Sequence, residues 1–184
     1  KRNKLYIYQK MEKTHKDCNS KNYIPLYNNF ISMREDRPYL SLLFPYIPMT
    51  LKDIMVYETF TKSELNSIYI QIFFLGYYLF NGNIKHNDIH ICNILIDILP
   101  EKENLLFIYD EKKYILPSQS KILYLIDFGI SEIESDKTIL FEEWKIFFSR
   151  LEKLFEIPPL FSTTSSFREI FDIILSFEIL EISL

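Results

Sequence analysis

The sequence has few of the residues on which several common kinds of binding site depend. Glycine occurs three times, as Gly76, Gly82 and Gly129, and this spacing excludes a glycine-rich loop that cradles nucleotide phosphates. Cysteine occurs twice, as Cys18 and Cys92, without a C-x-x-C pair. Reduced thiols in a cytosolic protein are therefore a better interpretation than a disulfide framework.

A strong charge imbalance and a long hydrophobic run are also missing. The net charge is −4 and the pI about 5.5, so neither nucleic acid nor an anionic membrane is expected as a partner. The most apolar stretch, Ile68–Phe80, is too short to span a bilayer and contains Gln71 and Gly76, which favours a buried helix. The polar N-terminus does not predict a secretory signal. With 184 residues, 48% of them hydrophobic, we expect one cytoplasmic domain around a single core.

Two short motifs carry side chains suited to chemistry. His86–Asn93 follows the pattern H-x-D-x-x-x-x-N, and Leu125–Gly129 has the sequence L-I-D-F-G. Transfer of a phosphoryl group needs a carboxylate beside the attacking hydroxyl and oxygen ligands that hold Mg²⁺. Asp88 suits the first role, and Asn93 with Asp127 suits the second. Either motif alone is weak, but the two together in this order are a strong indication of phosphoryl transfer.

Two simpler interpretations of these motifs stay open. Asp88 and Asn93 could only cap a turn, which is a frequent role for both residue types. His86 and His90 could be half of a zinc site, although the sequence offers no third cluster of ligands. Cys92 lies beside a proposed ligand, but no cationic residues surround it, so we expect it to pack rather than react.

The local patterns around the motifs predict helices and strands. Thr50 with Asp53, and Thr61 with Glu64, form capping boxes that predict two helix starts. The second helix has apolar residues at core spacing, and Asn81–Gly82 is expected to end it. Apolar periodicity predicts the remaining elements, namely a helix over 4–16, strands over 30–33, 39–44, 94–96, 105–109, 114–116 and 121–124, a helix after Asp136, and a last helix from Ser166 to Ile179.

The motifs resemble those of the protein-kinase-like proteins of large DNA viruses. The resemblance is carried by H-N-D-I-H-I-C-N-I-L, by a Tyr- and Lys-bearing hairpin that ends in I-L-P, and by K-I-L-Y-L-I-D-F-G, within about Tyr39–Ser131. It implies a protein kinase-like α+β fold, in which residues 1–48 form a partial N-lobe and hinge and residues 49–184 form a mainly helical C-lobe. ATP and Mg²⁺ would be the cofactors, and a serine or threonine hydroxyl of a protein would be the substrate.

The resemblance also assigns a role to individual residues. Asp88 would accept or orient the substrate hydroxyl, and His90 would reach the γ-phosphate, while His86 would brace the catalytic loop. Asn93 and Asp127 would bind Mg²⁺. The adenine pocket would be formed by the gatekeeper Phe44, the hinge residues Pro45, Tyr46 and Ile47, and the floor residues Leu95 and Ile126. Asp136 would anchor the backbone of the catalytic loop from the start of the next helix.

The segment between the motifs, at about 99–120, is expected to hold an inserted hairpin. Residues 105–109 and 114–116 flank the charged stretch Asp110–Lys113, which predicts two strands and a turn. Because this tip is charged, we expect the hairpin to project near the nucleotide cleft as a contact for a substrate or partner. Deleting Lys102–Ser118 should then leave the fold intact.

Several features depart from the family. No strand carries the lysine that clamps the nucleotide phosphates, and Glu12 is the only glutamate before Glu35 that could pair with such a lysine. The first three strands of an N-lobe would precede this chain. Asn87 replaces the arginine of H-R-D and no A-P-E motif follows Gly129, so we expect neither control by phosphorylation of an activation loop nor a long peptide-docking segment. The chain alone should bind Mg·ATP weakly or not at all.

Two other classes of function remain. One is a truncated pseudokinase that acts as a binding scaffold. The other is a small-molecule phosphotransferase of the aminoglycoside or choline kinase type, since a histidine two places after the catalytic aspartate is similar to such enzymes and to haspin-like kinases. That second class predicts an acidic pocket, for which Glu142, Glu143 and Glu152 are the candidates. The sequence predicts neither the phosphoacceptor nor the oligomeric state.

Overall fold

The chain combines helices with short antiparallel strands, and the computed structural model describes residues 2–17, 21–22, 24–35, 37–177 and 181–182. This mixture confirms the predicted α+β class. The elements, in chain order, are α1 (Arg2–Asp17), β1 (Asn28–Arg34), β2 (Arg37–Leu43), β3 (Met49–Thr50), α2 (Leu51–Tyr57), α3 (Lys62–Asn81), β4 (Ile84–Lys85), the 3₁₀ turn η1 (Ile91–Asn93), β5 (Ile94–Ile98), β6 (Asn104–Tyr109), β7 (Lys112–Pro117), β8 (Lys121–Leu125), the 3₁₀ turn η2 (Phe128–Ile130), β9 (Glu132–Ile133), α4 (Lys137–Leu154), α5 (Phe167–Leu175) and β10 (Glu181–Ile182).

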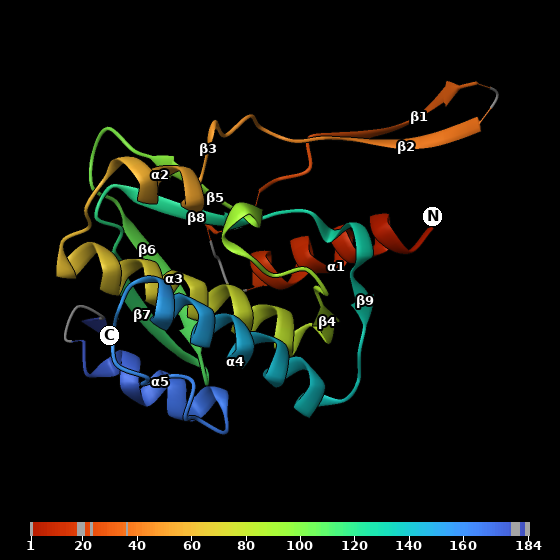
Figure 1. Cartoon of the computed structure of the whole chain (residues 1–184). Coiled ribbons are helices and arrows are strands. Elements are labelled where there is room, and N and C mark those ends of the chain that lie inside the picture. The colour runs from red at the N-terminus through yellow and green to blue at the C-terminus, as the bar shows by residue number, and fades with distance from the viewer. Residues whose placement is uncertain (1, 18–20, 23, 36, 178–180, 183–184) are drawn as a thin grey trace.

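The long helix α3 lies at the centre of the core, as the sequence predicted. Every residue from Ser67 to Gly76 is buried, so the helix is covered on all sides. Helices α4 and α5, the β6–β7 hairpin and α1 surround it (Figure 1). At Gly76 the helix passes close to α4, because an added Cβ atom there would lie only 2.6 Å from Cδ2 of the buried Trp144. None of the helices in the described ranges is long and apolar enough to cross a membrane.

The two predicted capping boxes both form. The Thr50 hydroxyl accepts from the Asp53 backbone N–H, and the Asp53 carboxylate accepts from Thr50 N–H at 2.9 Å. Thr61 and Glu64 repeat this reciprocal pair at the start of α3. Each pair satisfies backbone donors that have no partner within the helix, which fixes where the helix begins.

The end of α3 differs in detail from the prediction. Gly82 has an ordinary helical φ of −72°, and the left-handed residue is Asn83, with a φ of 55°. Asparagine tolerates this conformation better than most side chains. Gly82 is useful here for its size, since a Cβ atom would lie 3.2 Å from the Tyr78 carbonyl oxygen.

Two polar contacts join α3 to the edge strand β8. The buried Gln71 side chain accepts from Leu123 N–H at 2.9 Å and donates to the Lys121 carbonyl at 3.0 Å. It therefore supplies the partners that a sheet edge lacks and explains a polar residue within the most apolar stretch of the sequence. The Lys121 side chain adds an ion pair between β8 and α3, because its ammonium lies 2.5 Å from the Glu64 carboxylate; it also lies 3.8 Å from the Glu58 carboxylate.

The inserted hairpin is part of the core, so the prediction that it projects near the nucleotide cleft is wrong. Strands β6 and β7 pair through a two-residue turn, Asp110–Glu111, in which both residues have positive φ. The inward side chains of both strands are buried, and Phe107 stacks on Phe74 of α3 at 4.1 Å between ring centroids. Tyr109 stacks on Phe171 of α5 at 3.9 Å. Deletion of Lys102–Ser118 would therefore remove part of the hydrophobic core, and it is not expected to leave the fold intact.

The β1–β2 hairpin extends away from the helices (Figure 1). Its strands are longer than the predicted 30–33 and 39–44, and in the described residues they pair only with each other. Ile31 is 74% exposed at the outer part of β1. The segment that follows β2 leads through Phe44 and Pro45 to β3, where the strand order is β3-β5-β8. The predicted last helix begins as expected after Ser166 but ends at Leu175, and 178–180 lie outside the described residues.

Candidate functional site

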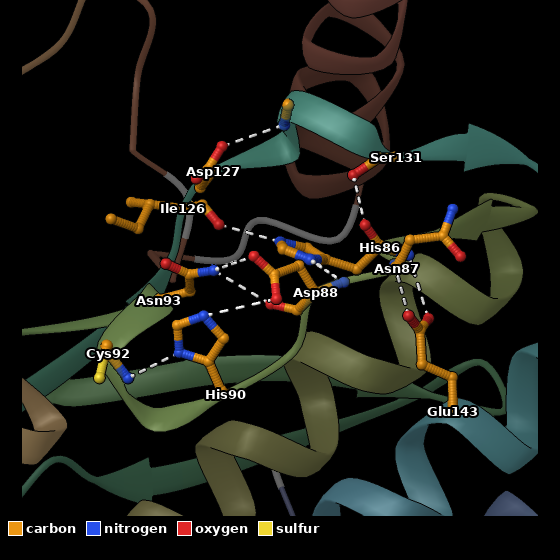
Figure 2. A network of polar contacts seen from close by, with 11 residues as sticks. His86, Asn87, Asp88, His90, Cys92, Asn93, Ile126, Asp127, Ser131 and Glu143 are labelled. Carbon is orange, nitrogen blue, oxygen red and sulfur yellow. Dashed lines mark hydrogen bonds and ion pairs between the residues drawn. The ribbon is translucent and has the colours of Figure 1, made fainter.

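Both sequence motifs lie at the same end of the β5–β8 pair. Strand β5 begins directly after Asn93 and β8 ends two residues before Asp127, and the antiparallel register pairs Ile94 with Leu125. The Ile126 backbone N–H donates to the Asn93 carbonyl at 2.9 Å, which extends this pairing to the motif residues. Figure 2 shows the resulting network of side chains.

Asp88 is held by its neighbours while its side chain stays accessible. The Asn93 Nδ2 amide donates to the Asp88 backbone oxygen at 3.0 Å and to its Oδ2 at 3.3 Å. His90 Nε2 lies 3.5 Å from Asp88 Oδ1, and its Nδ1 accepts from the Cys92 backbone N–H at 3.2 Å (Figure 2). The Asp88 side chain is 46% exposed, so the oriented carboxylate is accessible from solvent.

His86 joins the two motifs through both ring nitrogens. Nε2 lies 2.9 Å from the Ile126 carbonyl, and Nδ1 is 3.3 Å from the Asp88 backbone N–H, which donates to it. A carbonyl on one side and an N–H on the other fit a neutral ring with its proton on Nε2. Burial lowers the pKa of His86, which favours the same neutral form. Both nitrogens are thus occupied, so the zinc pair with His90 is not formed.

The backbone of the loop that carries the first motif is anchored by Glu143, whereas the sequence had predicted Asp136. Glu143 Oε2 accepts from His86 N–H at 3.0 Å, and Oε1 accepts from Asn87 N–H at 2.5 Å (Figure 2). Asp136 instead caps its own helix by accepting from Thr138 N–H at 2.8 Å. The loop crosses α4 about two turns from its start, which is out of reach of an N-cap residue. Burial raises the pKa of Glu143.

Sequence reasoning named Glu143 only as a candidate for an acidic pocket and missed its anchoring role, although a signal was present. It lies one turn from Leu140 and Phe147, both of which are buried, so it belongs to the core-facing side of α4. A carboxylate on that side needs donors, because burying it unpaired would be costly. Its backbone partners come from a distant part of the chain, however, and no local pattern identifies them.

Asn87 connects the loop of the first motif to the segment after D-F-G. Its backbone has a left-handed φ of 68°, and its Nδ2 donates to the Ile130 carbonyl at 3.1 Å and to Glu132 Oε1 at 3.0 Å. The Ser131 hydroxyl adds a hydrogen bond to the His86 carbonyl at 3.0 Å. These contacts hold the segment against the loop, with asparagine in place of the arginine of H-R-D.

Asp127 has an unusual backbone conformation and an exposed side chain. Its φ of 59° is left-handed, which is rare for a residue other than glycine and is concentrated at functional sites. The carboxylate Oδ1 accepts from the Gly129 N–H at 3.1 Å. The next residue, Phe128, is buried between the His86 ring at 4.7 Å and the Tyr8 ring of α1 at 5.4 Å.

A cavity of about 270 Å³ lies next to Asp127. Four of the six predicted adenine contacts line it, namely Phe44, Pro45, Leu95 and Ile126. The sequence did not identify the contributions of α1 and the segment after it, which are Tyr8, Met11 and Ile24. Burial raises the pKa of the Tyr8 hydroxyl, against the opposite effect of a hydrogen bond from the Phe128 backbone.

The other two predicted adenine contacts lie elsewhere. Tyr46 and Ile47 line a neighbouring cavity of about 390 Å³, together with Lys21 and Tyr124. Pro45 and Ile24 border both cavities. Tyr46 is 88% exposed. The structure therefore brings together the predicted gatekeeper, first hinge residue and floor, and leaves the rest of the hinge outside that cavity.

The oxygen atoms near the cavity fit Mg²⁺. Because the Asn93 Nδ2 is directed at Asp88, its Oδ1 is left as the atom for a cation, and Asp127 adds a carboxylate. Mg²⁺ prefers oxygen ligands and keeps waters and phosphates, so it needs few protein groups. Within the part of the chain that is described, no three His, Cys, Asp or Glu side chains gather where they could hold a metal ion.

Comparison with known proteins gives no family for this chain. No protein-family model matches it, and no curated protein matches it. The motifs and the geometry in Figure 2 are therefore the features of this chain that point to a function.

Proposed function

We propose that this chain is the catalytic region of an atypical protein kinase, which transfers the γ-phosphoryl group of ATP to a serine or threonine hydroxyl of a protein. The proposal depends on one observation above all: Asp88 and Asn93 are hydrogen-bonded to each other, and Asp127 joins them through the Ile126–Asn93 backbone contact. A carboxylate for the hydroxyl and two oxygen ligands for Mg²⁺ are the groups that phosphoryl transfer needs.

The fold supports the proposal at the level of its elements. In this interpretation α1 and the β1–β2 hairpin form a partial N-lobe within residues 1–48, and residues 49–184 form a C-lobe around α3. The buried Phe128 packs against α1, and the position of this D-F-G phenylalanine distinguishes active from inactive kinases. The β6–β7 insertion would stabilise the C-lobe by packing against α3 and α5.

The 270 Å³ cavity would hold the adenine ring of ATP. Aliphatic and aromatic side chains form most of its wall, which suits a planar base, and it is smaller than typical pockets for whole ligands of about 300–1,000 Å³. Asp127 at its border would meet the phosphates as they leave the cavity. Mg²⁺, when bound by Asn93 and Asp127, would neutralise charge on the phosphates.

Asp88 would orient the acceptor hydroxyl and take up its proton. Asn93 and His90 hold the carboxylate from two sides, so little reorganisation is needed. Glu143 and His86 act as positioning residues, because they fix the backbone on either side of Asp88.

The proposal can be tested by an NMR titration of the chain with ATP, with and without Mg²⁺. We expect weak, Mg²⁺-dependent shifts at amides around the cavity. Asp127→Asn should remove the Mg²⁺ dependence because it weakens a metal ligand. In a full-length version, Asp88→Asn should keep binding and abolish phosphoryl transfer to serine or threonine peptides, because it acts on the nucleophile. Asp172→Asn on the exposed side of α5 is the matched control. Equal shifts in wild type and Asp127→Asn would contradict the proposal.

One observation favours a second candidate, a binding module without transfer activity. Among the described residues that line the 270 Å³ cavity, none is a lysine or arginine that could clamp phosphates. Absence of any nucleotide-induced shift would support this candidate. The small-molecule phosphotransferase lacks such support, because Glu143 anchors the catalytic loop, Glu142 pairs with Lys145 at 4.0 Å and Glu152 accepts from the Ser162 N–H.

A further inference from the structure

A second hollow adjoins Asp88 on the side of α4. It has a volume of about 200 Å³ and shares no lining residue with the 270 Å³ cavity. We call it the α4 groove, and it is lined by Asn87, Asp88, Ile89, His90, Glu143, Ile146, Phe147 and Arg150. The four α4 residues follow the spacing i, i+3, i+4 and i+7, so they form one stripe along the helix.

The two ends of the α4 groove differ in charge. Asp88 and Glu143 lie at one end, but both Glu143 oxygens already accept backbone N–H groups. Arg150 lies about 10 Å further along α4, given a rise of about 1.5 Å per residue. Its side chain is exposed, and within the described residues it forms no ion pair. A guanidinium group in this position is available to an anion.

The middle of the α4 groove is apolar. Phe147 is buried and forms the floor, while Ile146 is 51% exposed. The segment 131–136, which follows D-F-G, does not line the groove, because β9 pairs with β4 and Ser131 bonds to the His86 carbonyl. The segment therefore leaves exposed an apolar strip of the α4 groove that runs from Asp88, the proposed catalytic aspartate, to the Arg150 guanidinium.

We propose that the α4 groove binds the acceptor as an extended peptide with an acidic residue about three positions from the phosphorylated serine or threonine. The rise of about 10 Å along α4 runs from Glu143, whose carboxylate binds the backbone next to Asp88, to Arg150, and it corresponds to three residues of extended chain at about 3.3 Å each. The hydroxyl would lie at Asp88, an apolar side chain would cover Ile146, and the carboxylate would pair with Arg150. This inference rests on the proposed function and adds the class of substrate to it.

The test measures binding of fluorescein-labelled peptides by fluorescence polarisation without nucleotide. The probes carry one serine with glutamate three positions before or after it, and matched probes carry lysine there. At low salt the better glutamate probe should bind about fivefold more tightly than its lysine counterpart, as expected for one partly exposed ion pair. Arg150→Glu should reverse this preference. Lys153→Glu makes the same charge change outside the groove and should leave it unaltered.

Three outcomes would overturn the inference. The first is equal binding of glutamate and lysine probes to the wild-type chain. The second is an equal effect of Arg150→Glu and Lys153→Glu, which would indicate only a response to net charge. The third is Arg150-dependent binding of glycerol 3-phosphate without peptide binding, which would assign the groove to small anionic alcohols. Because none of these measurements involves ATP, they fail independently of the Asp127→Asn titration.

Discussion

Replacing Gly76 with alanine tests the close approach of α3 and α4 by the sign of its effect on stability. In an ordinary helix interior this change is favourable by about 1 kcal/mol. Here the new methyl group would lie 2.6 Å from Cδ2 and 2.8 Å from Cε3 of Trp144, where ordinary contacts begin at 3.4 Å. The indole would have to withdraw by about 0.8 Å.

The expected result is a net loss of stability. Trp144 is 1% exposed, so no free space receives the displaced ring. Overpacking of this kind costs about 1–3 kcal/mol, and contact with three ring atoms favours the upper end. After subtraction of the gain in helix propensity, we expect Gly76→Ala to lower the free energy of unfolding by about 2 kcal/mol.

Urea unfolding followed by far-ultraviolet circular dichroism measures this change, with a constant m-value as a check. Combining Gly76→Ala with Trp144→Phe should recover about 1–2 kcal/mol relative to the sum of the single changes, because the smaller ring leaves room for the methyl group. Gly82→Ala is the control, since its nearest contact would be 3.2 Å and a smaller loss is expected. A Gly76→Ala chain more stable than wild type would refute the close approach.

Three further changes test other parts of the structure. Phe107→Ala should lower the free energy of unfolding by about 3–5 kcal/mol because its ring is buried against α3, whereas Lys113→Ala at an exposed position should be nearly neutral in the same urea assay. The Lys121 hydrogen bond lowers the pKa of Glu64 to about 2. The ionised Glu64 should therefore add about 1–2 kcal/mol, after screening, to the free energy of unfolding above pH 4.5, and this contribution should be lost as the pH falls toward 2. Glu64→Gln should remove this pH dependence of stability. Glu143→Gln should reduce stability by about 1–3 kcal/mol, because its amide NH₂ would face a backbone N–H, and should reduce phosphoryl transfer more than nucleotide binding.

Local patterns predicted the elements that local interactions determine. The start of α3 follows from Thr61 and Glu64, which are neighbours on one helical turn, and its burial follows from apolar residues on every side. The pairing of the two motifs also follows from the sequence, because an apolar strand adjoins each of them. The helix start depends on residues close together in the chain, and the pairing of the motifs depends on two strands that can each be recognised locally.

The remaining features depend on tertiary contacts. The tip of the β6–β7 hairpin is charged, and this suggested a peripheral position, yet the alternation of Leu105, Phe107 and Tyr109 already indicated one buried face. Glu143 could not be assigned because its partners lie in another part of the chain. The contribution of Tyr8 to the cavity depends on how α1 packs against Phe128, which spacing alone does not determine.

The two-residue turn of the inserted hairpin divides the functional site between two halves of the chain. A cut between Asp110 and Glu111 would leave Asp88 and Asn93 on one fragment and Asp127 on the other. The buried faces of β6 and β7, which pair along their whole length, would then be the surface on which the fragments find each other. The Mg²⁺ binding proposed for Asn93 and Asp127 would then require the reassembled pair, so the hairpin is a suitable place to split this protein into a complementation reporter.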